Sequence, residues 1–464
     1  MNLSLLIASI VFVSLIYNDF IVIEDINTLA LVFIAMYAVN SVLFLYRYRR
    51  YNIVCFETFF LFAFFLATFQ YPLLANEFDY YTINRLFSIS NQSYIDSMCV
   101  ALFGCLFFLF GAILLGKSER PKKLTYDFSH INIYKLNNLF QYSTFAMFLA
   151  VMYMGGYKIL SQYSVESSDR WGGAGALWDI LWILFIISSV LQFIKMSNVG
   201  IRSASKIIPK FDKIYLINAL LNTSLLLVAG YRSEFLFLIS PLFLLYSSLV
   251  RRINTRQLLV VAIVGYLVLL IVGATRDFAG GVLNTENITR IESIFDNTTD
   301  VVRDFTPANG ALYHLVDYAD KNGITWGSNI LLQVLAVVPF LQSLSLSLFE
   351  FVPGVSSSIL FTLNLNYKNW SSGLGTHIIG DLYYTFGLVG VILFMSILGI
   401  AVSYLYNAIY IKRTSSIYIW TALCIMFANS LYSVRVEYFF ILRTLGLSML
   451  TIFLFSLIHQ RKKT

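Results

Sequence analysis

The sequence has little charge, and it lacks long polar stretches outside one segment. Only 12% of its 464 residues are charged and 58% are hydrophobic, whereas soluble domains carry roughly a quarter charged residues. Apolar runs recur from Leu3 to Ile458, and the one long interruption lies between Arg276 and Thr376. The composition excludes an ordinary soluble enzyme and predicts one membrane domain with one large loop.

Cysteine is also scarce, and its placement excludes the usual cysteine frameworks. The four cysteines form no C-x-x-C pair, and all lie within apolar runs: Cys55, Cys99, Cys105 and Cys424. A disulfide or metal role is therefore not expected. The first nine residues contain no basic region and no small-residue cleavage site. We therefore expect a retained first helix in place of a removed signal peptide.

What the sequence does contain is a series of apolar segments of membrane-spanning length. A helix needs about 20 apolar residues to cross the hydrocarbon core. Twelve segments qualify, namely 3–23, 28–46, 53–74, 96–116, 138–155, 176–194, 214–229, 234–250, 258–274, 383–408, 417–433 and 441–458. The predicted fold is therefore that of an all-α polytopic membrane protein with about twelve transmembrane helices.

The positions of the basic residues predict how these helices are oriented. The segments after every second apolar run hold most of the Lys and Arg residues but only three acids, Glu119, Asp127 and Asp212. This positive-inside pattern places both termini in the cytoplasm, and it explains the net charge of +7 without a nucleic-acid partner. The chain then divides into helices 1–9 (residues 1–274), a large extracytoplasmic loop (275–382), and helices 10–12 with a cytoplasmic tail (383–464).

The large loop is expected to contain both helical and re-entrant segments. Residues 330–349 are apolar and long enough to span, but a thirteenth crossing would place Lys412 and Arg413 outside. A re-entrant or interfacial hairpin is the preferred interpretation. Four acids recur every four residues, at Glu292, Asp296, Asp300 and Asp304. They predict an amphipathic helix with a solvated acidic face, since carboxylates one turn apart on a straight helix do not wrap a cation.

Several arginines lie at the predicted outer ends of helices. Arg232 and Arg435 occupy the short tips 230–234 and 433–437, Arg276 closes the ninth helix, and Arg443 follows in the twelfth. An arginine at this depth costs on the order of 2.5–3.5 kcal/mol on insertion scales, so a partner is expected. The partner is either a nearby acid, such as Glu234 for Arg232, or a bound anion. Because a guanidinium matches phosphate bidentately, several such tips on one side favour an anion site.

A glycine-rich stretch at the predicted outer mouth of the tenth helix carries a candidate acid–base pair. If this stretch is helical, His377 and Asp381 share one face, as where a carboxylate orients an imidazole base. The alternative is an interfacial histidine followed by a helix-start acid. His130 and His459 are cytoplasmic in this topology and His314 stands alone, so neither a metal nor another cofactor is predicted. Outer aromatic residues are typical of an interfacial belt, except Trp370, which lies beside this stretch and is a candidate sugar-stacking residue.

Together these features resemble the O-antigen polymerases (Wzy type) and their relatives, the O-antigen ligases. The shared features are many helices, a G-x-R-S tip at residues 230–233, a large outer loop in the second half, and a following glycine and aromatic stretch at 373–375 and 384–390. The topology covers the whole chain, whereas the motifs cover only a small part of it.

The resemblance implies a GT-C-like glycosyltransferase of lipopolysaccharide or related polysaccharide biosynthesis in the bacterial cytoplasmic (inner) membrane, with an extracytoplasmic active face. It implies transfer of a growing glycan from one undecaprenyl diphosphate carrier onto an oligosaccharide repeat carried by another, without a cofactor. A chain-length regulator protein and membrane lipid are further candidate partners. The competing interpretations are a ligase-type lipid-linked glycosyltransferase and a polysaccharide transporter or flippase. A transporter is expected to show related halves with broken helices, which the sequence lacks.

The resemblance also suggests roles for the residues selected above. The leaving diphosphate needs its charge neutralised, and the candidates are Arg232, Arg276, Arg435 and the loop residue Arg303. His377, oriented by Asp381, is the candidate base for the acceptor hydroxyl. The expected supporting residues are Glu234, Glu437, Arg443 and Tyr384.

Overall fold

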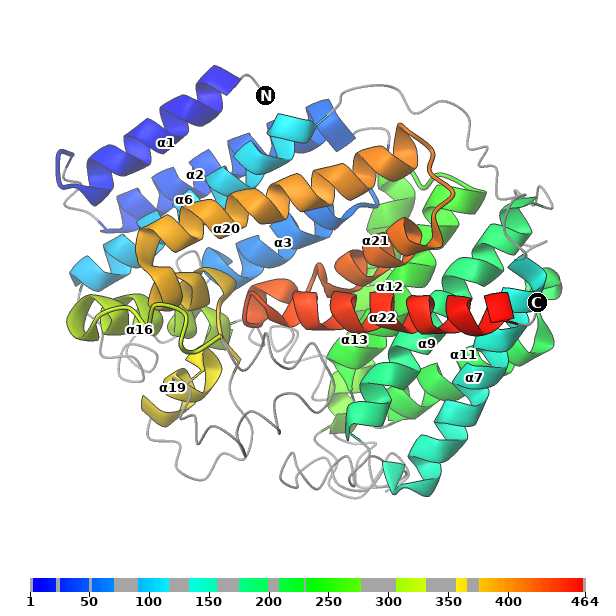
Figure 1. The fold of residues 1–464 in the computed structure, drawn as a ribbon. Coiled ribbons are helices and arrows are strands. Elements are labelled where there is room, and N and C mark those ends of the chain that lie inside the picture. The colour runs from blue at the N-terminus through cyan, green and yellow to red at the C-terminus, as the bar shows by residue number, and fades with distance from the viewer. Residues whose placement is uncertain are drawn as a thin grey trace.

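The computed structural model describes residues 3–21, 26–49, 52–70, 91–116, 133–156, 175–198, 208–228, 231–276, 306–330, 356–364 and 375–461. Throughout these ranges the regular structure is helical (Figure 1). Each of the twelve predicted segments contains a helix: α1 (Leu3–Tyr17), α2 (Ile26–Phe44), α3 (Phe56–Thr68), α6 (Asn91–Leu115), α7 (Ile133–Tyr153), α9 (Gly175–Asn198), α11 (Lys213–Val228), α12 (Arg232–Leu245), α13 (Thr255–Arg276), α20 (Ile378–Tyr410), α21 (Ile417–Asn429) and α22 (Phe440–Arg461). Short π-helical segments are η1 (Leu45–Arg49) and η4 (Tyr246–Val250), and short 3-10 helices are η3 (Ile208–Lys210) and η5 (Ser433–Arg435).

Six of the described helices are long and apolar enough to cross a membrane, judged by length and composition. They are Asn27–Arg49, Gln92–Leu115, Leu177–Ser197, Ser233–Val250, Ile378–Tyr410 and Phe440–Leu457. The apolar helices α1, α3, α11, α13 and α21 contribute shorter stretches. The described part of the chain is therefore all-helical, with several helices apolar enough to be embedded in a membrane, as the apolar runs predicted.

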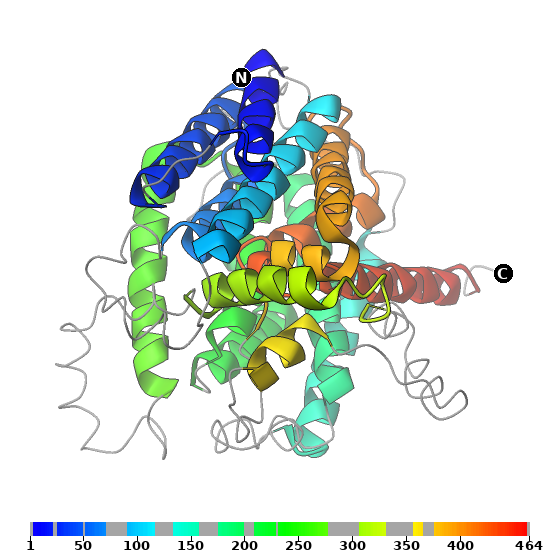
Figure 2. The ribbon, with the colours of Figure 1, turned by 90° about the vertical axis from the view of Figure 1, so that its left-hand side faces the viewer.

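The helices form two groups that meet at α20 and α21. In the first group, α1 and α2 pack on α6, and α6 pairs with α20 along much of its length. In the second group, α7, α9, α11 and α12 pack on one another. The helix α21 contacts both α20 and α9, and α22 crosses the front of the bundle in Figure 1. Figure 2 shows the C-terminal end of α22 projecting from the bundle.

The pair α6 and α20 is held by close backbone contact. A Cβ placed on Gly399 of α20 would lie 2.1 Å from the carbonyl oxygen of Phe108 on α6, so only glycine fits there. Packing of this kind suits helices in a membrane, where close approach of backbones replaces the hydrophobic driving force available in water.

The helix α20 begins at Ile378, five residues before the predicted start of the tenth helix at 383, and it breaks at Gly387 (φ 67°, ψ −162°). The segment before the break is covered by the loop helix α16 (Thr306–Asn322). The turn after α16 is bonded to the same segment, because the Thr325 amide donates to the Tyr384 carbonyl (3.0 Å) and the Asn329 side chain donates to Thr385 (2.8 Å). Hydropathy missed this first turn because other parts of the chain bury its polar residues.

Between residues 275 and 382 the structure describes the helices α16 and α19 (Ser357–Asn364), neither of which the sequence pattern located. Both lie against the start of α20, at the lower left of Figure 1. The acidic row 292–304 and the apolar segment after Ile330 lie outside the described residues, so the predicted amphipathic helix and re-entrant hairpin stay predictions.

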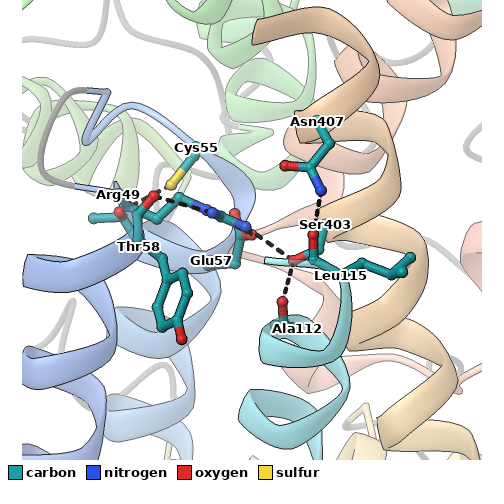
Figure 3. A network of polar contacts seen from close by, with 9 residues as sticks. Arg49, Cys55, Glu57, Thr58, Ala112, Leu115, Ser403 and Asn407 are labelled. Carbon is teal, nitrogen blue, oxygen red and sulfur yellow. Dashed lines mark hydrogen bonds and ion pairs between the residues drawn. The ribbon is translucent and has the colours of Figure 1, made fainter. Parts of the chain in front are cut away.

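A buried ion pair ties together the opposite end of the first helix group (Figure 3). The Arg49 and Glu57 side chains are both 0% exposed. Arg49 Nε donates to Glu57 Oε1 (2.9 Å), and Arg49 Nη2 donates both to Glu57 and to Ser403 Oγ (2.9 Å) on α20. Ser403 in turn donates to the Ala112 carbonyl of α6 (2.8 Å), and the guanidinium lies 3.9 Å from the ring centroid of Tyr406. Arg49 is one of the basic residues that follow the second apolar run, and the structure places its side chain in the core.

Candidate functional site

The start of α20 and the tip between α21 and α22 are joined by hydrogen bonds. The Thr376 amide donates to the Arg435 carbonyl (3.2 Å). The Asp381 carboxylate, 0% exposed, accepts from the Tyr438 amide at its Oδ2 (3.0 Å). The glycine-rich stretch and the Arg435 tip were selected independently from the sequence, and the structure brings them together.

The loop helix α19 adds hydroxyl groups to this cluster. Thr376 Oγ1 donates to Ser357 Oγ (3.0 Å), and Ser358 Oγ donates to Glu437 Oε1 (3.2 Å). The Glu437 carboxylate also acts electrostatically on Asp381, so two acids lie near one another at the start of α20. We refer to Ser357, Ser358, Thr376, Asp381, Arg435, Glu437 and Tyr438 as the mouth cluster.

The mouth cluster contains the two acids Asp381 and Glu437, and Arg435 joins it through its backbone carbonyl. Asp381 is enclosed, whereas Arg435 and Glu437 are only half-buried. Arg435 and Glu437 are therefore the charged members of the cluster that a ligand can reach. A carboxylate that is partly exposed can take a proton from a bound hydroxyl, and a guanidinium on the same tip could hold an anionic group.

His377 has a different role from the predicted one. Its backbone is extended (φ −123°, ψ 129°) and it caps the N-terminus of α20, where Nδ1 accepts from the Ile379 amide (3.2 Å). The proton therefore resides on Nε2, which lies 3.1 Å from Thr68 Oγ1 at the end of α3 and donates to it. Burial lowers the pKa of His377 to about 3, so the ring is neutral near pH 7, with both nitrogens engaged.

The prediction that the Asp381 carboxylate bonds to the His377 ring and orients it is therefore wrong, because the ring bonds to Thr68 and to the Ile379 amide. The prediction assumed that both residues are helical, which would place them on one face. Because His377 is the cap, its ring folds back over the first turn, while the Asp381 carboxylate reaches the Tyr438 amide instead. Whether either residue takes part in catalysis stays a prediction.

The remaining selected residues lie in different places. Arg443 forms an ion pair with Asp179 of α9 (2.6 Å), a partner that no local pattern indicated. Glu234 accepts from the Ser233 hydroxyl (2.6 Å). Both Arg443 and Glu234 line a cavity between α9, α12, α21 and α22. Tyr384 is buried beside Tyr318 of α16, with ring centroids 5.9 Å apart, and it holds the loop helix against α20.

Part of the predicted arginine set lies outside the description. Arg232 is the first residue of α12 and Arg276 the last of α13, but their side chains are not among those described. Arg303 and Trp370 lie outside the described residues altogether. Of the four predicted diphosphate ligands, Arg435 is therefore the one whose side chain the structure describes, and that side chain is half-buried.

Sequence reasoning missed several members of the site. Thr68 and Tyr438 contribute through a side chain and a backbone amide that carry no motif. Asp179 is 264 residues from Arg443, so only the tertiary structure pairs them. Comparison with known proteins found no matching family model, no matching curated protein and no matching solved structure.

Proposed function

We propose that this chain polymerises oligosaccharide repeats carried on undecaprenyl diphosphate, in a reaction at the extracytoplasmic face of the bacterial cytoplasmic membrane. The observation that carries the proposal is the mouth cluster, in which Arg435 and Glu437 lie against the Thr376–Asp381 segment. The cluster brings Arg435, a candidate anion-binding residue, together with two carboxylates at the start of α20. That combination suits transfer of a sugar away from a lipid diphosphate.

The proposal includes twelve membrane crossings with both termini in the cytoplasm. Its support is that contacts join helix ends which the charge pattern places on the same side. At the predicted outer side, Thr68 at the end of α3 contacts His377 at the start of α20. At the predicted inner side, Ser248 of η4 contacts Tyr410 at the end of α20. A helix inverted relative to α20 would not make these contacts, so they support the relative orientation of these helices, while the cytoplasmic side is assigned by the charge pattern.

The proposed reaction is a single glycosyl transfer. A hydroxyl oxygen of the acceptor repeat forms a bond to C1 of the donor glycan, the C1–O bond to the lipid diphosphate breaks, and the diphosphate leaves with the bonding electron pair. Arg435 neutralises the charge that develops on the leaving oxygen, together with Arg232 and Arg276 as further candidates. The acceptor proton passes to a carboxylate, and we assign this step to Glu437, because both nitrogens of His377 are already bonded.

The test is complementation of a strain whose own gene for this chain has been deleted. Arg435→Ala and Arg232→Ala should each remove long glycan chains, with a fall in polymerisation of about 100-fold or more, while the protein accumulates normally in the membrane. Glu437→Gln should have a similar effect. The matched control is Arg47→Ala, an exposed arginine at the predicted inner side.

The pattern of glycans on a gel separates the outcomes. Loss of polymerisation leaves a single repeat on the lipid core, whereas loss of a ligase leaves none. Ladders of normal length from both Arg435→Ala and Glu437→Gln would contradict the proposal, and a complete absence of repeats would favour the ligase.

A further inference from the structure

A cavity of about 100 Å³ lies between α9, α12, α21 and α22. Its lining includes Tyr432, which directly precedes η5 and stands three residues before Arg435. The cavity therefore adjoins the mouth cluster along the chain while drawing its walls from different helices.

The polar side of the cavity is formed by a half-exposed ion pair and an acid. Asp179 and Arg443 are each 37% exposed and lie 2.6 Å apart. Within the described part of the chain, Arg443 uses one of its five N–H groups in this pair, so the guanidinium can donate further. Glu234 completes this side beside Ser233. At such a surface the carboxylates can accept hydrogen bonds from vicinal hydroxyl groups, and the guanidinium can donate hydrogen bonds to them.

The apolar side of the cavity is aromatic. Trp182 and Phe237 both line it, and their ring centroids are 6.3 Å apart at an angle of 51°. Trp182 is half-buried and also packs beside Trp178, at 5.8 Å between centroids. Aromatic faces carry negative charge density and so attract the C–H groups on one face of a sugar ring. The lining thus combines groups that can bond to hydroxyl groups with rings that can pack on the apolar face of a sugar.

The charge of the cavity argues against the diphosphate itself. Among the described residues, the charged lining side chains are two carboxylates, Asp179 and Glu234, and one guanidinium, Arg443, an excess of one negative charge in this part of the lining. A diphosphate placed there would be repelled, whereas a neutral polyhydroxyl ligand would not.

We infer that this cavity binds a sugar ring of the glycan, as a saccharide subsite separate from the mouth cluster that is proposed to carry out transfer. The inference rests on the proposed function for the identity of the ligand as a repeat-unit sugar. It assigns Trp182 as the stacking platform, and Asp179, Glu234 and Arg443 as the hydroxyl-binding groups. Binding energy from this subsite would hold the glycan while its end reacts.

The experiment measures binding directly, with no reaction required. The probe is the free oligosaccharide repeat, released from its lipid diphosphate by mild acid, and it is titrated into the purified full chain in lipid nanodiscs. Wild type should bind it, and Trp182→Ala and Glu234→Gln should each weaken binding about tenfold, which is a change of about 1.4 kcal/mol. The matched control is Trp326→Ala, because Trp326 is a 78% exposed tryptophan outside the cavity. Trp182→Phe keeps an aromatic ring and should retain most of the affinity, which guards against loss of folding.

Each other outcome overturns the inference. If the cavity variants bind the repeat as tightly as wild type does, the sugar binds elsewhere. If wild type binds polyprenyl phosphate and not the free repeat, and Trp182→Ala weakens that binding, the cavity is a lipid site. If wild type binds neither probe, the cavity is no ligand site.

The two proposals can fail separately. The polymerase proposal would be refuted, and the saccharide subsite supported, if Arg435→Ala and Glu437→Gln gave normal glycan ladders while repeat binding depended on the cavity. The subsite would be refuted, and the polymerase supported, if those variants lost their ladders while Trp182→Ala bound the repeat as wild type does.

Discussion

Removing Arg49 should destabilise the bundle far more than removing an exposed cation. Arg49 and Glu57 are both fully buried, so Arg49→Met leaves a carboxylate inside the core without its counter-charge. Breaking a buried pair in this way costs about 3–5 kcal/mol. Loss of the contact between the guanidinium and Tyr406 (3.9 Å) acts in the same direction.

The size of the effect can be expressed as a melting shift. An unfolding entropy of about 2.1 cal/mol/K per residue over 464 residues is about 1 kcal/mol/K, so the loss corresponds to a decrease in Tm of about 3–5 °C. In detergent the shift should be larger, because helices persist in the unfolded protein and the unfolding entropy is smaller. The assay is the fraction of purified protein that remains monodisperse after heating.

The double variant provides the decisive comparison. Replacing both members of a buried pair by apolar residues is often neutral or stabilising, so Arg49→Met combined with Glu57→Met should melt above either single variant. Lys321→Met is the control, because Lys321 is 67% exposed in its pair with Asp317 and such pairs contribute about 0–1 kcal/mol. The reasoning would be refuted if the decrease in Tm of the double variant equalled or exceeded the sum of the two single decreases. It would also be refuted by an Arg49→Met protein as stable as wild type.

Two further predictions concern packing and pH. Gly399→Ala should lower the melting temperature, because its Cβ would lie 2.1 Å from the backbone of α6, whereas Gly265→Ala on α13 meets no atom within 4 Å and should be neutral or stabilising by up to about 1 kcal/mol. Burial opposes ionisation of Asp317, but hydrogen bonds from Lys321 (2.7 Å) and Ser93 (2.6 Å) outweigh it and lower the pKa of Asp317 below its usual 3.8. The bond from Ser93 holds α16 against α6. The stability that it gives to this docking is present above pH 3.8 and is lost as pH falls through the lowered pKa of Asp317. Pepsin cleavage of α16 should therefore rise at low pH in wild type, and Asp317→Asn should show a smaller pH dependence; equal profiles would contradict this.

The pattern of apolar segments predicted the helices well because it reflects a strong physical demand. A chain in a membrane must satisfy its backbone hydrogen bonds internally, so a long apolar run becomes a helix wherever it is placed. All twelve predicted segments contain one. The ends were less predictable, as at α1, which stops at Tyr17 before a positive φ at Asp19 (58°).

The sequence indicated two segments of the candidate site but not the contacts that join them. The tip with Arg435 and the stretch with His377 and Asp381 were both recognisable from charges in apolar surroundings. Their contact was not, because it runs through the backbone amides of Thr376 and Tyr438, which carry no sequence signal. The predicted pairing of His377 with Asp381 failed for a local reason, since helical spacing applies only inside a helix and His377 precedes it.

The sequence by itself determined that this chain is helical and membrane-embedded, because those properties follow from hydrophobicity and backbone hydrogen bonding. Only the tertiary structure decided which of the polar groups meet. Arg49 donates to Ser403, which is 354 residues away in the sequence, and Arg443 pairs with Asp179, which is 264 residues away. Such pairs depend on how the helices pack, and packing is set by side-chain shape across the whole bundle, which no local pattern of residues encodes.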